Sequence, residues 1–379
     1  MNRLLSRDLY SSREISETVF AMKTKKIIIK IGTNVISTDD GRLDEKIIGN
    51  IQSQVSAIKK NGADVIMVSS GAVGAGRALV DDHDKLDTIS RRQILASVGQ
   101  IRLMNIYADL FAKDDLLCAQ VLATKEDFRD RRHYLNIRNC LEGLMKKNIV
   151  PIVNENDVIS ITELMFTDND ELAGMIAAMM SVDAMVILTN IDGVYDRAPG
   201  EKGAQVIREI NPKKLDYENF ISPEKSSFGR GGMLTKCHVA EKLAYLGIAT
   251  HVVNGKRPDV ILDLLGGEQI GTKFVPVKNA SSRVKWAAFS GGFEKGVVLV
   301  DDGAEKALIS KEKVSSLLFV GVKKIEGEFG NGDIVKIKNL RGKDLGMGIV
   351  QCDSGRARGL IGKKNVKPLI HYNYLFLEK

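Results

Sequence analysis

Short runs of apolar residues alternate with longer amphipathic stretches over the first two thirds of the chain, from Lys25 to about Pro276. The runs have the length of single strands, and the stretches between them carry apolar residues at helical spacing. Six strands are predicted, at residues Ile27–Ile31, Val65–Ser69, Leu116–Gln120, Val150–Asn154, Met185–Thr189 and Thr250–Asn254. Near-continuous apolar strands separated by helices are typical of a mainly parallel sheet covered on both faces, so we expect an α/β fold in three αβα layers.

One of the intervening helices is predicted with both of its ends. Five apolar residues recur at helical spacing between Ile47 and Ile58, after Asp44, a residue type that caps helix N-termini. Asn61 and Gly62 follow and are typical of a helix C-terminus.

The pattern changes after Pro276 to short apolar runs separated by glycine-containing turns. Four strands are predicted, at Val297–Val300, Leu317–Val320, Asp333–Ile337 and Gly348–Gln351. We therefore expect a small all-β unit. The predicted organisation is an N-terminal extension at 1–23, an α/β domain at 24–276, a linker at 277–292 and a β domain at 293–379.

The net charge of +7 is confined to the second unit. From Arg283 onward the chain carries 18 lysines and arginines against 11 aspartates and glutamates, which accounts for the whole excess. Such asymmetry is produced by a solvated basic face or by a nucleic-acid surface, and both interpretations stay open.

Several classes of protein are excluded by simple counts. The four cysteines are far apart, with no CxxC, so we expect neither disulfides nor a zinc site, and a reducing cytoplasm fits. No apolar stretch approaches the roughly 20 residues that span a bilayer, so no membrane segment is predicted. Residues 1–23 mix arginines with acidic residues and lack an apolar signal core, which predicts a loosely ordered extension.

Two predicted strands end in elements suited to anions. The first runs into glycine in KKIIIKIGTN, which places Lys30 and Gly32 at the carboxyl edge of the sheet, where open α/β sheets bind ligands. The second ends in SSGAVGAGR, Ser69–Arg77, whose backbone amides at a helix start would suit an anion. This element matches neither the Walker nor the dinucleotide fingerprint, and close packing of a helix explains its glycines equally well.

Polar clusters follow two further strand ends. Asn154 to Asp157 spell NEND, and Asp168 to Asp170 spell DND before an alanine-rich helix. Such clusters often cap helices, but two of them at one sheet edge favour recognition of an amine or a metal. The last element is GRGGMLTK, Gly229–Lys236, in which glycines would let the backbone approach phosphates and Lys236 would lie one turn into a helix.

The ordered set KIGT, SSGA, NEND, DND, TNIDGVY and GRGGMLTK resembles the amino acid kinase family over Lys25 to Pro276. NEND, DND and GGMLTK together resemble the members that phosphorylate the side-chain carboxylate of glutamate in the first step of proline biosynthesis. The tail, with LVDDGAEKAL, SLLFVGV and GEFGNGDIVKI, resembles a PUA domain, a small β barrel.

The resemblance implies a role for each matching residue. It makes Lys30 and Lys236 the phosphate-stabilising pair and Asp170 the carboxylate that organises them, while Ser70, Asp157 and Asn169 hold the amino acid. It implies ATP as a substrate and Mg²⁺ as a cofactor, and it assigns no residue of the chain as a metal ligand. The residues that it assigns to ATP are Lys30, Thr189, Asn190, Arg230, Gly231, Gly232, Met233, Leu234, Thr235 and Lys236.

The chain departs from the family pattern twice. Thr167 and Asp168 stand where a glycine usually precedes DND, and Asn190 stands where an aspartate usually follows the strand threonine. The second departure affects the expected nucleotide contact. The expected reaction is unchanged. Glutamate is already ionised at neutral pH and needs no general base, which fits the absence of a catalytic histidine from these motifs.

The resemblance also implies partners. They are glutamate and ATP, proline as a feedback inhibitor, a second copy of the chain in a homo-oligomer, and a downstream reductase for the labile acyl phosphate. Two alternatives remain open at this point: a family member that phosphorylates aspartate, acetylglutamate, carbamate or UMP, and an RNA-binding protein that acts through the basic tail.

Overall fold

The computed structural model describes residues 24–80, 87–128, 131–160, 168–213, 232–277, 294–310 and 315–377. Predictions that concern the N-terminal extension, Thr167, Arg230, Gly231 and residues 278–293 lie outside these stretches.

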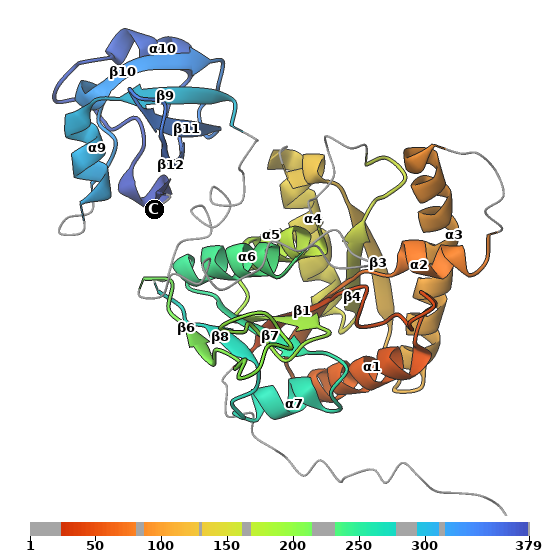
Figure 1. Ribbon diagram of the computed structural model, residues 1–379. Helices are drawn as coiled ribbons and strands as arrows, with labels where there is room; N and C mark the ends of the chain where they lie inside the picture. Colours follow the sequence, from red (N-terminus) through yellow and green to blue (C-terminus); the bar gives the residue numbers. More distant parts are fainter. Residues whose placement is uncertain are drawn as a thin grey trace, which may run out of the picture.

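An eight-stranded sheet forms the centre of the first unit (Figure 1). Its order is β3-β4-β2-β1-β5-β7-β8-β6, and every pairing is parallel except that of β7 with β8. The strands are β1 Lys26–Ile31, β2 Asp64–Ser69, β3 Cys118–Ala123, β4 Val150–Glu155, β5 Ala184–Thr189, β6 Glu209–Ile210, β7 Ala249–Asn254 and β8 Thr272–Phe274. The mainly parallel sheet is confirmed. β3 begins two residues later than predicted, and β6 and β8 were not predicted because they are only two and three residues long.

Alternate residues of the strands serve two separate cores. Ile27, Ile29 and Ile31 of β1 pack with α1, α3 and α7, whereas Ile28 packs on the opposite face with α4, α5 and α6. The side chains of a strand point alternately to the two faces, so the isoleucine run of β1 builds both cores at once and gives the predicted three layers. The helices of this unit are α1 Glu45–Lys60, α2 Ala72–Arg77, α3 Thr88–Ala112, α4 Arg131–Lys146, α5 Asn169–Met180, α6 Met233–Tyr245 and α7 Val260–Leu265, with a 3₁₀ turn at Lys125–Phe128.

Helix caps fix where several of these helices begin. Asp44 accepts hydrogen bonds from the backbone N–H groups of Lys46 and Ile47, which confirms the predicted start of α1. The helix ends at Asn61, also as predicted. Each such cap satisfies N–H groups that the helix leaves without a partner.

Helices α2 and α3 pack at backbone contact because both carry glycine where they meet. A Cβ atom at Gly99 would lie 1.8 Å from the Ala72 carbonyl oxygen, and one at Gly76 would lie 2.0 Å from that of Leu95. This close approach brings the middle of α3, at Gly99, next to the turn that follows β2.

A second sheet forms the C-terminal unit in the order β10-β9-β11-β12-β13. Its strands are β9 Gly296–Val300, β10 Val322–Gly327, β11 Ile334–Asn339, β12 Asp344–Ile349 and β13 Leu375–Leu377. Two helices, α9 Asp302–Ile309 and α10 Ser354–Leu360, accompany the sheet, with 3₁₀ turns at Phe319–Gly321 and Tyr372–Tyr374. The sheet was predicted, whereas the helices were not.

Two strand positions in this unit were predicted wrongly. Leu317–Val320 is no strand: Leu317 forms an isolated bridge to Ile370, and a 3₁₀ turn follows. The run is apolar because it is buried, and burial alone does not distinguish a strand from a turn. The strand predicted at Gly348–Gln351 lies earlier, at Asp344–Ile349, and contains two glycines. The backbone of Phe376 leaves no room for a Cβ atom at Gly346, and the side chain of Ile370 leaves none at Gly348.

Candidate active site

The carboxyl ends of β1, β2, β4 and β5 meet the first turns of α2, α5 and α6 around a cavity of about 510 Å³. The chain runs from β1 to β2 on one side of the sheet and later to β5 on the other side. A sheet of this kind opens a crevice at the point where its strand order reverses, outside the carboxyl ends of the strands. The cavity lies at that point, between β1 and β5.

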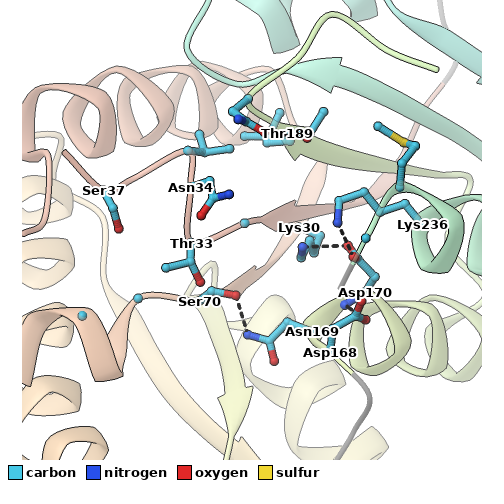
Figure 2. A pocket seen from close by; sticks show the side chains of 18 of the residues that line it. Lys30, Thr33, Asn34, Ser37, Ser70, Asp168, Asn169, Asp170, Thr189 and Lys236 are labelled. Carbon is cyan, nitrogen blue, oxygen red and sulfur yellow. Dashed lines mark hydrogen bonds and ion pairs between the residues drawn. The ribbon is translucent and has the colours of Figure 1, made fainter. Parts of the chain in front are cut away.

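A single carboxylate joins two lysines in this cavity (Figure 2). Asp170 Oδ1 lies 2.7 Å from Lys30 Nζ, and its Oδ2 lies 2.9 Å from Lys236 Nζ. Lys30 comes from β1, Asp170 from the first turn of α5 and Lys236 from the first turn of α6. Three elements far apart in the sequence therefore place two ammonium groups side by side.

The electrostatics of this cluster favour its charged form. Burial opposes ionisation of the fully buried Asp170, but the ammonium groups of Lys30 and Lys236 outweigh it and hold the pKa of Asp170 at about 2. Burial lowers the pKa of Lys30, an effect that Asp170 partly offsets. For Lys236, burial acts downward, but Asp170 outweighs it and raises the pKa. The cluster carries two cations on one anion, an excess of positive charge suited to an anionic ligand.

Asp168 combines a structural contact with a free oxygen. Its Oδ1 caps α5 by accepting hydrogen bonds from the backbone N–H groups of Asp170 and Glu171, at 2.9 and 3.0 Å. Its Oδ2 is buried with no hydrogen-bond partner among the described residues, and the side chain lines the cavity. Burial, then the charge of Asp170, raises the pKa of Asp168 to about 7. The sequence indicated Asp168 only as a member of the DND cluster, with a cap or the recognition of an amine or a metal as its role.

The paired serines at the end of β2 have different partners. The buried hydroxyl of Ser69 lies 2.9 Å from that of Tyr107 on α3, which is a core contact. Ser70 faces the cavity, where its Oγ accepts a 2.8 Å hydrogen bond from Asn169 (Figure 2). Gly71 follows at φ +110°, and a Cβ atom there would lie 2.8 Å from Ile36, so the turn into α2 requires glycine.

An amide network connects the two polar clusters. Asn169 also donates to Asn154 Oδ1 at 3.0 Å, and Asn154 in turn donates to Gln100 of α3 at 2.9 Å. The ends of β2, β4 and the start of α5 are thereby held in one arrangement. Asn154 was expected only as a member of the NEND cluster, and Gln100 was not predicted, because an amide inside helix α3 has no pattern of its own.

Asp157 forms an ion pair with an arginine that also lines the cavity. Its Oδ1 accepts hydrogen bonds from Nε of Arg92, at 2.9 Å, and from Nη2 of the same side chain. The Nη2 atom also lies 3.7 Å from Glu155. Arg92 is in the second turn of α3 and was not predicted, because nothing in the sequence around it differs from an ordinary helix surface.

The opposite end of the cavity contains the residues expected to contact nucleotide. Thr189, Asn190, Gly232 and Met233 line it, together with Lys236. Leu234 and Thr235 belong to α6 but do not line the cavity, and Arg230 and Gly231 lie outside the described residues. The cavity wall here also includes Ile191, Gly193 and Tyr195 of the TNIDGVY motif, which had no assigned role. It further includes three residues that the sequence did not indicate, Arg197, Ala198 and Pro199.

Comparison with known proteins decides the family. The model described as "Amino acid kinase family" matches residues 25–254, which is more than half of the chain. The chain belongs to the amino acid kinase family. Within that family, a curated glutamate 5-kinase from Chlorobaculum tepidum is 49% identical over 93% of this chain and 97% of its own length. One from Bacteroides thetaiotaomicron is 46% identical over 93% and 98%.

The C-terminal unit matches a family model of its own. A model described as "PUA domain" matches residues 296–372 of this amino acid kinase, the stretch that contains most of the second sheet. Among solved structures, the isopentenyl phosphate kinase of T. acidophilum, in a product complex, aligns with a TM-score of 0.48 at 19% identity, over 66% of this chain and 99% of that one.

The two departures from the family pattern have different outcomes. Asn190 is exposed at the end of β5, and its Oδ1 lies 3.4 Å from the hydroxyl of Thr189. Thr167 lies outside the described residues.

Within the described parts of this amino acid kinase, no group of three or more histidine, cysteine, aspartate or glutamate side chains could hold a metal ion by itself. Likewise, none of the helices described is long and apolar enough to cross a membrane.

Proposed function

We propose that this amino acid kinase is a glutamate 5-kinase, which transfers the γ-phosphoryl group of ATP to the side-chain carboxylate of L-glutamate. The product is L-glutamyl 5-phosphate, and the reaction is the first step of proline biosynthesis. The observation that carries the proposal is the pair of ammonium groups, Lys30 and Lys236, held on Asp170 at the centre of the cavity. The similarity to curated glutamate 5-kinases over nearly the whole chain supports it.

The acceptor chemistry explains what the cavity contains. A glutamate side chain has a pKa of about 4.3 and is ionised at neutral pH, so the nucleophile needs no base to activate it. The difficulty is that an anion must approach a polyanionic triphosphate in line. Cations fixed in place reduce that repulsion and stabilise the charge that develops on the transferred group.

Lys30 and Lys236 supply these cations, and Asp170 positions them. Because each ammonium group is bound to one oxygen of the same carboxylate, neither lysine loses its orientation when the phosphoryl group moves. Lys236 also lies in the first turn of α6, at the positive end of that helix.

Mg²⁺ would enter as its complex with ATP. Magnesium is commonly held by one or two carboxylates together with substrate phosphates, and the buried, unpartnered Oδ2 of Asp168 fits that requirement. The ion would neutralise part of the triphosphate charge. The residues of the chain bind and orient the two substrates around it.

The amino acid occupies the end of the cavity at β2 and β4, where Ser70, Asp157 and Asn169 provide its polar contacts. ATP occupies the end at β5 and α6, with its phosphates toward Lys30 and Lys236. The remaining proposed nucleotide contacts are Thr189, Asn190, Arg230, Gly231, Gly232 and Met233, while Leu234 and Thr235 would support this segment from within α6.

Acceptor specificity tests this function. ADP release should depend on glutamate and be far slower with aspartate, acetylglutamate, carbamate or UMP at equal concentration. Equal turnover with one of these would assign the chain to another branch of the family.

Further partners follow from the same proposal. A chain of this activity would be cytoplasmic, would respond to proline as an inhibitor and would supply its labile acyl phosphate to a reductase.

Ile94, Val98 and Ile101 are exposed at helical spacing on α3, and such an apolar surface supports a homo-oligomer. Size-exclusion chromatography with light scattering would measure the assembly.

The domain limits remain those expected from the sequence, residues 24–276 for the kinase unit and 293–379 for the PUA unit. The basic excess and the PUA match favour a second candidate function, weak binding of RNA by the C-terminal unit. Its test is retention of RNA at low salt with loss at higher salt.

A further inference from the structure

The ion pair between Arg92 and Asp157 occupies the place where the proposed substrate would present its amino-acid end. Asp157 is buried, whereas the Arg92 side chain is 29% exposed, and both residues line the cavity. Lys30, which marks the reacting end, lines the same cavity. A glutamate whose side-chain carboxylate meets the lysines must direct its α-carbon groups elsewhere in this space.

A glutamate molecule brings two groups to this end, an α-ammonium and an α-carboxylate. Asp157 is suited to the ammonium group, but the α-carboxylate also needs a partner. The amide network of Asn154 and Asn169 carries no charge, and Glu155 and Asp157 would repel a carboxylate. A cation beside Asp157 would suit the α-carboxylate, and Lys30 and Lys236 are at the reacting end. Of Arg77 and Arg92, which both line the cavity, Arg92 is the one paired with Asp157.

Arg92 has the geometry to be that cation. Its hydrogen bonds to Asp157 use Nε and Nη2, and its Nη1 has no hydrogen-bond partner among the described residues. Guanidinium groups bind carboxylates well because their N–H donors form a fixed planar fork. Helix α3 holds this fork in place, since the neighbouring Gln93 donates a 2.7 Å hydrogen bond to the carbonyl of Val158 in the loop after Asp157.

The geometry points to Arg92 as a specificity-determining residue that binds the α-carboxylate of the substrate while Asp157 binds its α-ammonium group. The two side chains form a preassembled receptor for the zwitterionic end of an amino acid. This inference rests on the proposed function and extends it, because it states which acceptors the site rejects: acids that lack either α-group. A purely structural Arg92, which only neutralised Asp157 and Glu155, would not discriminate among acceptors.

Two simple acids, each lacking one α-group of glutamate, distinguish an Arg92 that binds substrate from a purely structural Arg92. 4-Aminobutyrate is glutamate without its α-carboxylate, and glutarate is glutamate without its α-ammonium group. We would measure kcat/KM of the full-length protein for glutamate and both analogues, or competitive inhibition constants where an analogue turns over too slowly. The variants are Arg92→Ala and Arg92→Lys. The matched control is Arg102→Ala, on the same helix, whose side chain pairs with Glu45 at 2.6 Å outside the cavity.

Arg92→Ala should lower kcat/KM for glutamate by about 10- to 100-fold, the usual range for a lost hydrogen bond to a charged group. The value for 4-aminobutyrate, which never uses Arg92, should stay within about twofold, so the preference between the two acids should collapse. Arg92→Lys should keep part of the preference, and Arg102→Ala all of it.

Equal losses for glutamate and 4-aminobutyrate, or an unchanged preference, would overturn the assignment of Arg92. If Arg92→Ala does not fold by circular dichroism, the preference of Arg92→Lys decides the question in the same way. Failure of the proposed function would look different, since the unsubstituted protein would then show no glutamate-dependent turnover at all.

Discussion

Asp170 is the residue on which the other site residues depend. It is fully buried, and its charge is maintained by the two lysines that it positions. Removal of one lysine therefore has two effects: it takes a cation away from the phosphoryl group, and it leaves part of a buried carboxylate without a partner. Different substitutions in the site should consequently affect different kinetic constants.

Lys236→Ala should lower kcat by about 100- to 1000-fold and change KM for glutamate much less, because the lysine acts on charge that develops in the transition state. Steady-state kinetics at saturating ATP measure both constants. Lys242→Ala, on the same helix and outside the cavity, is the control. A near-normal kcat in Lys236→Ala would remove this lysine from the catalytic group.

Asp157→Asn should raise KM for glutamate by about 10- to 100-fold with a smaller effect on kcat, since it removes the charge opposite the α-ammonium group and leaves the lysines intact. Asp109→Asn, an exposed change on α3, serves as control. The assignment of the NEND loop to the amino acid would be wrong if ATP affinity fell while KM for glutamate stayed the same.

At this scale the sequence predicted charged residues better than their partners. Lys30, Asp170 and Lys236 were assigned together, and they lie in one cluster. Arg92 was missed, and Asn154 was expected only as a member of the NEND cluster, because each acts through a contact with a residue far away in the chain. The unpartnered oxygen of Asp168 depends on burial, which the DND cluster alone does not reveal. A local pattern carries no information about such contacts.

The elements of the kinase unit were predicted well where local chemistry sets their limits. Asp44 and Asn61 bound α1 as expected, and the buried apolar strands of the sheet have few alternatives. In the C-terminal unit, β12 begins at Asp344, four residues before the predicted Gly348. Its Gly346 lies against the backbone of the distant β13, and the local sequence does not reveal that contact. Strand β7 contains a buried histidine, His251, in a position where an apolar residue is usual.

His251 lies inside β7 between Val186 of β5 and Lys273 of β8, and neither ring nitrogen has a hydrogen-bond partner among the described residues. Burial, then the charge of Lys273, lowers its pKa to about 4. The unfolded chain, with an ordinary pKa of about 6.5, takes up this proton first, so stability should be lost as pH falls from about 6.5 to 4. The loss amounts to about 3 kcal/mol at most.

His251→Val, which suits a buried strand, should remove this part of the pH dependence. Urea unfolding at pH 7 and pH 4.5 measures it, with the exposed His238→Gln as control. An unchanged pH dependence in His251→Val would show that the imidazole is not the group that responds.

At the scale of the whole molecule, the chain combines a kinase sheet with a second sheet whose residues supply none of the cavity wall. The change of hydrophobic pattern near Pro276 predicted this division. The separate charge balance of the two parts supports it, since the excess of +7 lies entirely after Ser282.

A fragment of residues 24–282 should therefore fold and retain glutamate-dependent ATP turnover within about threefold, because it keeps every residue assigned to phosphoryl transfer. Circular dichroism and the turnover assay test this together. A well-folded fragment without turnover would show that the PUA unit completes or assembles the site, and the two-module interpretation would fail.

The most direct measurement is a chemical trap for the acyl phosphate. Hydroxylamine, added to the full-length protein with ATP, Mg²⁺ and glutamate, should yield glutamyl hydroxamate in amounts equal to the ADP released. Asp170→Asn, which removes the charge that pairs with both lysines, should abolish both products together. ADP without hydroxamate, or hydroxamate formation that survives in Asp170→Asn, would contradict phosphoryl transfer to the glutamate carboxylate at this site.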